Sequence, residues 1–204
     1  MNPLGFIYKS SRFILLRILH LIHTLWTYFL LKAHSIQFES FKTNGVPFIV
    51  LSKGGKFVIG NKLKINNTVA GNPIGRSQRC SFFVGENATL TIGENVGMSQ
   101  TAIVCHERIE IGNNIKIGGG VCIYDTDFHS LDPAKRRDPK ADFADKKCKP
   151  VYIEDNVFIG AHSTILKGVR IGHNSIIGAC SVVTKNIPAN QIWGGNPACF
   201  IKPV

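Results

Sequence analysis

The strongest pattern along the chain is a repeat of six residues between Ile153 and Val183. Every sixth position carries a β-branched aliphatic residue, and the position four residues later is small or β-branched. Neither a helix nor a simple strand has this period, whereas a strict repeat of six residues is typical of a solenoid. The aliphatic positions are Ile153, Ile159, Ile165, Ile171, Ile177 and Val183, and the positions four residues later are Val157, Ser163, Val169, Ser175 and Ser181.

We expect each unit of six residues to form one short strand and one turn, with its aliphatic side chain inside the solenoid. Three units would then form one roughly triangular coil, so that residues eighteen apart lie one above another. The same period recurs upstream in shorter runs. These runs are Ile59 and Ile65; Ile92, Met98 and Val104; and Ile111, Ile117 and Ile123.

One interruption of the repeat is informative. Ile123 and Ile153 are thirty residues apart, a multiple of six, so the solenoid resumes in phase after an insertion at residues 124–150. Insertions in repeat proteins form loops on one face, which is often the binding face. We therefore expect the chemistry of this protein in the inserted loop.

The first 38 residues form a different segment. They carry basic residues and no acidic one, and the stretch from Phe13 to Leu31 is strongly apolar. Polar residues at helical spacing, from Arg17 to Thr27, predict an amphipathic helix rather than a membrane span or a signal peptide. The apolar face of this helix is expected either to pack on the solenoid or a neighbouring subunit, or to make peripheral membrane contact through residues 1–34.

The predicted fold is therefore all-β: a solenoid with an N-terminal amphipathic helix and one inserted loop. We expect the helix and a connector at residues 1–45 and the solenoid at residues 46–204.

Composition and charge narrow the function. The net charge of +11 suits an anionic ligand or membrane surface, but the basic residues are scattered, so no nucleic-acid partner is expected. The six cysteines have no CxxC spacing, so we expect no metal. In a chain without an export signal they are expected to be free, buried thiols of a cytoplasmic protein, which would lie at the inner face of the membrane if the helix binds lipid.

His129 is the best candidate for catalysis. It lies near the start of the insertion, and Asp125 and Asp127 precede it by four and two residues. A carboxylate that binds one ring nitrogen fixes the tautomer and stabilises the imidazolium, which leaves the other nitrogen free to take a proton. We predict that His129 is a general base and that Asp127 or Asp125 orients it.

Three stretches beside the repeats strengthen this interpretation: Asp125-x-Asp127-x-His129, the segment 176–188, and the ending Gly194-Gly195-Asn196-Pro197-Ala198. Together they resemble the hexapeptide-repeat acyltransferases. The resemblance is closest to sugar O-acetyltransferases, namely the maltose and galactoside enzymes and those of capsule, colanic acid and lipopolysaccharide pathways.

The resemblance implies a left-handed parallel β-helix, a homotrimer, and acetyl-coenzyme A bound between adjacent subunits. It places the catalytic base at His129 and an acceptor-facing wall at Met98, Ser99 and Gln100, where the maltose and galactoside enzymes have an asparagine. It places the coenzyme along Phe158, Gly160, Ala161, Ala179, Thr184, Lys185 and Lys202.

The implied reaction is direct transfer of the acetyl group to a hydroxyl of a glycan, without an acetyl-enzyme. Backbone N–H groups near Gly160 and Ala161 would stabilise the oxyanion. Two alternatives remain open at this point: an amine acceptor, such as an amino sugar, serine or an antibiotic, and a solenoid scaffold without catalysis.

Overall fold

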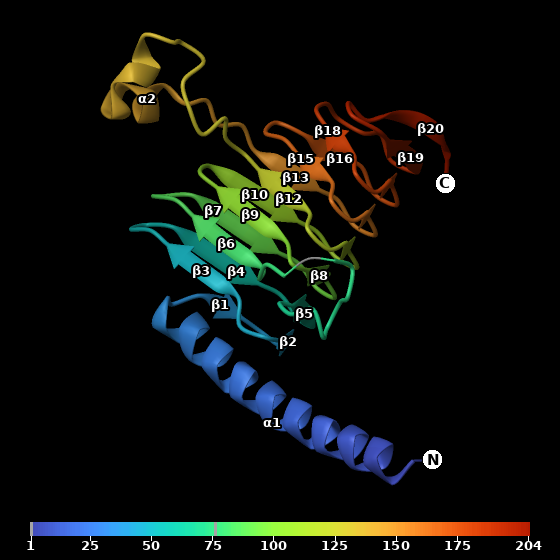
Figure 1. Cartoon of the computed structure of the whole chain (residues 1–204). Coiled ribbons are helices and arrows are strands. Elements are labelled where there is room, and N and C mark those ends of the chain that lie inside the picture. Colours follow the sequence, from blue (N-terminus) through green and yellow to red (C-terminus); the bar gives the residue numbers. More distant parts are fainter. Residues whose placement is uncertain (1, 76) are drawn as a thin grey trace.

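The computed structural model describes residues 2–75 and 77–204. It shows a solenoid with one helix along its N-terminal end and one loop that projects from its side (Figure 1). Each coil contributes one strand to each of three faces, which we call sheets A, B and C in chain order. The three edges where the chain passes from one sheet to the next are the A–B, B–C and C–A corners.

Sheet A is made of parallel strands that pair in the order in which the coils stack. Its strands are β1 (Gln37–Phe38), β4 (Lys56–Ile59), β7 (Thr89–Ile92), β10 (Arg108–Ile111), β13 (Val151–Ile153) and β16 (Arg170–Ile171).

Sheet B is parallel except for its last strand, which turns back on the one before it. Its strands are β2 (Phe41–Asn44), β5 (Leu63–Asn66), β8 (Gly97–Ser99), β11 (Lys116–Ile117), β14 (Phe158–Ile159), β17 (Ile176–Ile177), β19 (Gln191–Gly194) and β20 (Cys199–Pro203).

Sheet C completes the coil and is parallel throughout. Its strands are β3 (Phe48–Leu51), β6 (Ser81–Val84), β9 (Ala102–Cys105), β12 (Cys122–Tyr124), β15 (Thr164–Ile165) and β18 (Val182–Val183).

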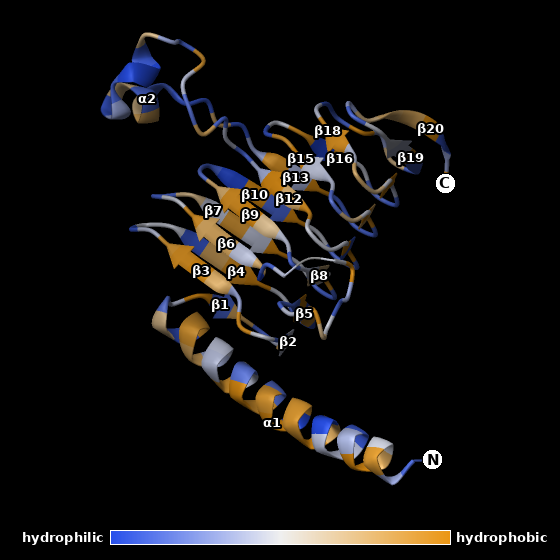
Figure 2. Cartoon of the chain, viewed as in Figure 1, coloured by the Kyte–Doolittle hydropathy of each residue, from blue (hydrophilic) through white to orange (hydrophobic). Residues whose placement is uncertain are grey.

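The predicted register is confirmed from Ile111 onward, but Val104 was wrongly taken as inward: Ile103 is buried there and pairs with Ile123, whereas Val104 pairs with Tyr124. The six aliphatic repeat positions from Ile153 to Val183 are at most 2% exposed, and partners eighteen apart pair across strands, such as Ile153 with Ile171. Ile111 pairs directly with Ile153, so the insertion leaves the stacking undisturbed. Figure 2 shows the apolar strands of this core beside more polar corners.

Asparagine builds the A–B corner. Asn114, Asn156, Asn174 and Asn190 have φ between 57° and 61°, a left-handed conformation that asparagine tolerates better than other residues with a side chain. Their amides also bond from coil to coil, because Asn174 accepts from Asn156 at 3.0 Å and donates to Asn190 at 2.8 Å. The turn and the stacking of coils are therefore stabilised by the same side chains.

The N-terminal helix is confirmed as α1 (Pro3–Ala33), which begins with Asn2 as N-cap. Only Thr27 and Leu31 of this helix are buried. The solenoid starts earlier than predicted, because β1 and β2 already pair with β4 and β5. The boundary at residues 45 and 46 is therefore corrected to about residue 37, where the first coil begins.

The cysteines follow the prediction in part. All six are free, but only Cys80 and Cys105 are buried, whereas Cys180 and Cys199 are exposed. Cys180 has a φ of 58° at the B–C corner, where its side chain points out of the coil rather than into the core.

Burial sets the expected reactivity of these thiols. Burial raises the pKa of Cys80 to about 12, and burial together with the charge of Asp125 raises the pKa of Cys105. Because the thiolate is the reactive form, a maleimide at pH 7 should label Cys180 and Cys199 within minutes and leave Cys80 and Cys105 unlabelled until the chain is denatured. Mass spectrometry of tryptic peptides checks this result, and rapid labelling of Cys80 in the native protein would contradict it.

Candidate active site

The inserted loop is closed at its base by its own two ends. Thr126 and Cys148 form an antiparallel bridge, the Asp127 N–H donates to the Lys147 carbonyl at 3.0 Å, and the Lys149 N–H donates to the Asp125 carbonyl at 2.9 Å. The loop therefore projects from the C–A corner with its two ends joined by hydrogen bonds.

Two short helices shape the loop beyond its base: a 3₁₀ turn, η1 (Lys135–Arg137), and α2 (Pro139–Asp145). Asp138 caps α2 by accepting the Ala141 N–H at 2.8 Å, and Pro139 occupies the first turn, where its missing N–H is harmless. This local start fixes the helix so that Asp142 and Asp145, three residues apart, lie on one face.

The structure gives His129 a carboxylate partner from α2. The His129 Nδ1 lies 2.7 Å from Asp142 Oδ2, and Asp142 Oδ1 accepts the Ser130 N–H at 2.6 Å. His129 first, and the Ser130 N–H second, lower the pKa of Asp142, so this carboxylate is ionised at neutral pH. Nδ1 therefore carries a proton toward Asp142, and Nε2 is left to accept one from a substrate. The His129 side chain is 70% exposed, so a substrate can reach it.

A second carboxylate holds the same segment. Asp145 accepts from Ser130 Oγ at 2.6 Å and pairs with Lys135 Nζ at 2.6 Å. Lys135 first, and Ser130 second, lower the pKa of Asp145. Ser130 is 1% exposed and contacts both Asp142 and Asp145, so the residue next to His129 is fixed in place.

The expected pairing of Asp125 with His129 is corrected. Asp125 is fully buried at the base of the loop, where its carboxylate accepts the backbone N–H groups of His106, Glu107 and Arg108 at 2.7, 2.7 and 2.9 Å. Its oxygens therefore accept the backbone N–H groups of a tight turn in the preceding coil. The chain turns away from Asp125 before it reaches His129.

Asp127 is also engaged elsewhere. Its Oδ1 lies 2.9 Å from Lys167 Nζ, which ties the loop to the next coil at the C–A corner. Phe128 has a φ of 65°, so the backbone reverses between Asp127 and His129 and the two side chains do not share a face as an extended strand would place them.

The predicted coenzyme residues at the B–C corner stack tightly. A Cβ on Gly160 would meet the Ala179 nitrogen at 2.5 Å, so only glycine fits beneath Ala179. The Gly160 N–H already donates to the Ile177 carbonyl at 2.7 Å, which removes it as an oxyanion donor. In the described part of the chain no acceptor is found for the Ala161 N–H, so Ala161 is the remaining candidate at this corner.

The other predicted coenzyme residues lie on the outside of the solenoid. Phe158 is 46% exposed on sheet B. Thr184 and Lys185 follow β18, and Lys185 Nζ lies 5.3 Å from the ring centroid of Trp193, which it covers. Lys202 is exposed in β20, paired with Ile192.

The residues predicted to face the acceptor are buried in the chain. Met98 is 2% exposed and points into the core, in line with Ile65 and Ile117, so it is no part of an outer wall. Ser99 Oγ accepts a hydrogen bond from the Asn66 side-chain amide at 3.1 Å. The Gln100 carbonyl accepts one at 2.8 Å from the side-chain amide of Gln78, which lies in the loop between β5 and β6.

One chain does not bring the predicted halves of the site together. The loop with His129 leaves the C–A corner, whereas Phe158 lies on sheet B and Ala161 at the B–C corner. The two corners are separated by the strands of sheet C. A catalytic site that uses both would need the loop of one chain against sheet B of another.

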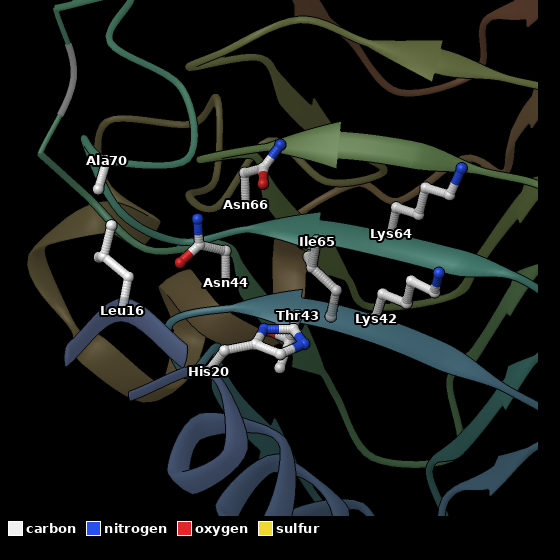
Figure 3. A pocket seen from close by; sticks show the side chains of 9 residues that line it. All are labelled: Leu16, His20, Lys42, Thr43, Asn44, Lys64, Ile65, Asn66 and Ala70. Carbon is white, nitrogen blue, oxygen red and sulfur yellow. The ribbon is translucent and has the colours of Figure 1, made fainter. Parts of the chain in front are cut away.

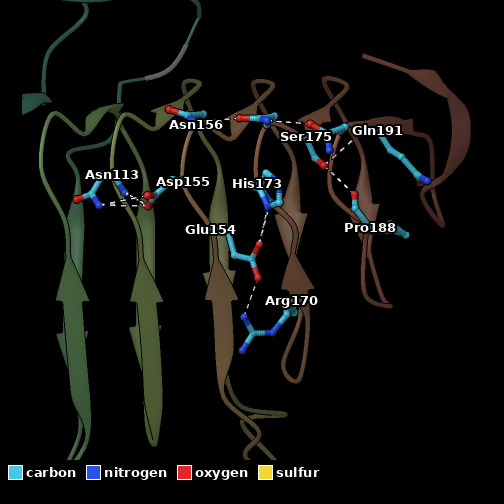
Figure 4. A network of polar contacts seen from close by, with 11 residues as sticks. Asn113, Glu154, Asp155, Asn156, Arg170, His173, Ser175, Pro188 and Gln191 are labelled. Atoms are coloured by element: carbon cyan, nitrogen blue, oxygen red, sulfur yellow. Dashed lines mark hydrogen bonds and ion pairs between the residues drawn. The ribbon is translucent and has the colours of Figure 1, made fainter.

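Two other polar surfaces lie outside this region. A pocket between α1 and the first strands of sheet B is lined by residues such as His20, Lys42 and Lys64 (Figure 3). At the A–B corner, Glu154 pairs with Arg170 at 2.8 Å and with His173 at 3.3 Å (Figure 4). Within residues 2–75 and 77–204 there is no group of histidine, cysteine and acidic side chains that could hold a metal ion.

Asp142 is the residue that reasoning from the sequence missed. The available signal was Asp138-Pro139, which marks the start of a helix. A helix from that point places Asp142 and Asp145 on one face, so the sequence predicts a short helix with two carboxylates in the same loop as His129. Its direction toward His129 depends on the closed base of the loop, which has no signature in the local sequence.

The comparisons with known proteins agree with this architecture. Residues 150–185 match the family described as bacterial transferase hexapeptide (six repeats). The galactoside O-acetyltransferase of Lactococcus lactis subsp. lactis (strain IL1403) is 40% identical over 120 residues, which are 59% of this chain and 54% of that protein. The chain thus spans about half the length of this curated relative.

Solved structures share the fold. A hexapeptide-repeat-containing acetyltransferase from Vibrio cholerae aligns with a TM-score of 0.51 and 33% identity over 56% of this chain and 62% of that one. An N-acyltransferase from Bacillus cereus, AntD, aligns with a TM-score of 0.62 and 22% identity over 85% of this chain and 86% of that one. The matches confirm the resemblance seen in the sequence: the chain carries the hexapeptide repeat of the bacterial transferases, and sugar O-acetyltransferases are among its relatives.

Proposed function

We propose that the protein is an O-acetyltransferase that moves the acetyl group of acetyl-coenzyme A to a hydroxyl of a glycan in the biosynthesis of a surface polysaccharide. The observation that carries this proposal is the His129–Asp142 pair on an exposed loop with a closed base. The galactoside O-acetyltransferase among the relatives supports an acetyl donor and a sugar acceptor.

The proposed step is direct transfer. Nε2 of His129 takes the proton from the acceptor hydroxyl while the hydroxyl oxygen attacks the thioester carbonyl. The carbon–oxygen bond forms, the carbon–sulfur bond breaks, and the proton passes to the leaving thiolate. In this proposal the Ala161 N–H stabilises the oxyanion, a contribution of roughly 3–4 kcal/mol for one good donor.

We further propose a left-handed coil and a homotrimer, as in the family that the sequence resembles. The separation of the His129 loop from Phe158 and Ala161 supports the trimer, because it leaves each chain with two half-sites. The excess of positive charge suits the phosphates of the coenzyme.

An amine acceptor is the second candidate. AntD, an N-acyltransferase, shares the fold at 22% identity, which leaves the acceptor chemistry open. The galactoside O-acetyltransferase matches 59% of the chain at 40% identity, a longer stretch than the 26% matched at 49% identity by an N-acetyltransferase of Staphylococcus aureus, and this longer match favours a hydroxyl.

The direct test measures free thiol released from acetyl-coenzyme A by the purified protein. The acceptor panel should include neutral oligosaccharides, lipid-linked glycans, amino sugars and serine. We expect thiol release above background only with acceptors that present a sugar hydroxyl. Release that depends on a free amine would replace this proposal by the amine alternative, and hydrolysis without any acceptor dependence would argue against both.

Asp142→Asn tests the partner that the structure assigns to His129. The amide keeps an oxygen for the Ser130 N–H but no longer carries the charge that holds the imidazolium. Turnover should fall roughly 10–100-fold, the range expected for a lost hydrogen bond to a charged group, while KM for acetyl-coenzyme A stays unchanged.

The matched control is Asp127→Asn, which removes a carboxylate from the same loop but one that pairs with Lys167. Its loss should lower thermal stability more than turnover. If Asp127→Asn lowers turnover and Asp142→Asn does not, the assignment of Asp142 is wrong.

A further inference from the structure

Helix α1 presents its apolar surface away from the protein. Fifteen of its large apolar side chains are between 40% and 74% exposed, including Ile14, Ile18, Leu25 and Phe29. A helix on the surface of a soluble domain normally has the reverse arrangement, with its apolar stripe against the core. Figure 2 shows α1 as a largely apolar helix along the end of the solenoid.

The side of α1 that meets the solenoid is the more polar one. His23 Nδ1 accepts the Gly45 N–H at 3.2 Å, Thr27 is fully buried, and Leu16 and His20 line the pocket beneath the helix. These residues recur at helical spacing and end at the buried Leu31. The opposite face, centred on Ile18 and Leu25, therefore has no partner within the described part of the chain.

Charge identifies what covers this face. The first 38 residues contain four lysines and arginines, Lys9, Arg12, Arg17 and Lys32, and no acidic residue. A protein partner for a broad apolar face would not require this bias. An apolar face bordered only by positive charge matches the interface of a bilayer that contains anionic lipids.

We propose that α1 is a membrane anchor that lies in the plane of an anionic bilayer. Its outer apolar face enters the boundary between headgroups and acyl chains, and the solenoid stands on the membrane with its first coil nearest the lipid.

The helix is long and apolar enough to cross a membrane by length and composition. Its contacts argue for the in-plane orientation instead. His23 and Thr27 are bound to the first coil, so a helix across the bilayer would carry Gly45 and its neighbours into the hydrocarbon. Arg17 and His20 also lie in the middle of the segment, where a span would bury them at high cost.

The pocket beside α1 supplies a site for a lipid headgroup. It has a volume of about 360 Å³ and lies between the helix and strands β2 and β5. Lys42 and Lys64 are paired on these neighbouring strands and extend side by side, with His20 approaching from the helix (Figure 3). The lining holds no carboxylate, so a phosphate of an anionic lipid fits its chemistry.

The experiment is flotation of the full chain with vesicles, together with tryptophan fluorescence. The vesicles contain phosphatidylcholine alone or mixed equally with phosphatidylglycerol. We expect the protein to float with the anionic vesicles. High salt should release it from these vesicles more readily than from vesicles of phosphatidylcholine alone, since screening weakens the electrostatic attraction. Trp26 is 54% exposed on α1 and Trp193 is 9% exposed, so a blue shift on binding reports Trp26. Brominated lipids should quench Trp26 best when the bromine is near the headgroup.

Two sets of variants separate the contributions. Ile18→Gln with Leu25→Gln should weaken binding to both vesicles by about 100-fold, because two large apolar side chains no longer enter the lipid. The control Thr24→Gln puts the same residue on the polar side, where Thr24 Oγ1 donates to the His20 carbonyl, and should bind like the parent. Lys42→Gln with Lys64→Gln should weaken binding to anionic vesicles by roughly 5-fold per lysine and leave binding to phosphatidylcholine unchanged.

Three results would overturn the proposal. The first is a full chain that stays in the aqueous fraction with anionic vesicles. The second is a Trp26 emission that is already blue-shifted without lipid and does not respond to vesicles, which would show that a second copy covers α1. The third is strongest quenching by bromines near the bilayer centre, which would indicate a span. None of these readouts uses the enzymatic activity, so they are independent of the proposed function.

Discussion

His129→Ala should lower turnover roughly 10²–10⁴-fold, the usual contribution of a positioned general base. The imidazole is exposed and contacts Asp142, so its removal leaves the solenoid intact. Affinity for acetyl-coenzyme A should therefore change little, and the effect should appear in kcat. The measurement is the initial rate of thiol release, with coenzyme affinity determined separately by calorimetry.

His173→Ala is the matched control. This histidine is also exposed and also beside a carboxylate, Glu154, but it lies at the A–B corner, away from the inserted loop (Figure 4). It should retain the parent's turnover. If His129→Ala turns over like the parent on an acceptor that the parent uses, His129 is not the base.

Ile171→Asp should have the largest effect on stability. Ile171 is fully buried between Ile153 on one side and Ile187 on the other, so the variant places an unpaired charge inside the stack. An uncompensated buried charge costs about 3–5 kcal/mol, which is comparable with the whole stability of many domains, about 5–15 kcal/mol. The measurement is denaturant unfolding monitored by circular dichroism. We expect the variant to be unfolded, or close to the midpoint of its unfolding transition, before any denaturant is added.

Two controls define this result. Ile171→Val keeps the shape of the stack and should cost only about 0.5–1.5 kcal/mol. Thr164→Asp puts the same charge on an outward position of β15 beside the buried Ile165 and should leave the midpoint close to the parent's. Parental stability in Ile171→Asp would mean that the inward register is wrong.

The core of the fold was predictable because each inward position imposes the same steric demand on every coil. The period of six residues placed Ile159 and Ile177 correctly, and the in-phase resumption at Ile153 located the insertion. The first coil was missed because β1 and β2 lack that period. The A–B corner also has a signal in the sequence, since asparagine recurs three residues after the sheet A aliphatic at Asn114, Asn156 and Asn174.

The candidate site was less predictable. His129 stood out by its place at the edge of the insertion, but its partner depends on how the loop closes. The nearby carboxylates of Asp125 and Asp127 are used to anchor that closure, and Asp142 reaches His129 from a helix thirteen residues away. Proximity in sequence is a poor guide where the backbone reverses, as it does at Phe128. Met98 was misplaced for a simpler reason, because its inward position follows from the same period that placed Ile117.

The central claim is transfer of an acetyl group to a sugar hydroxyl, and the chemistry of the product tests it most directly. The parent protein is incubated with acetyl-coenzyme A labelled in the acetyl group and with the acceptor that supports thiol release, and the labelled glycan is then treated with mild alkali. We predict that the glycan carries the label and that alkali removes it, because an O-acetyl ester is cleaved under these conditions. Label that survives alkali would identify an amide and contradict the account, as would the absence of label from every acceptor in the panel.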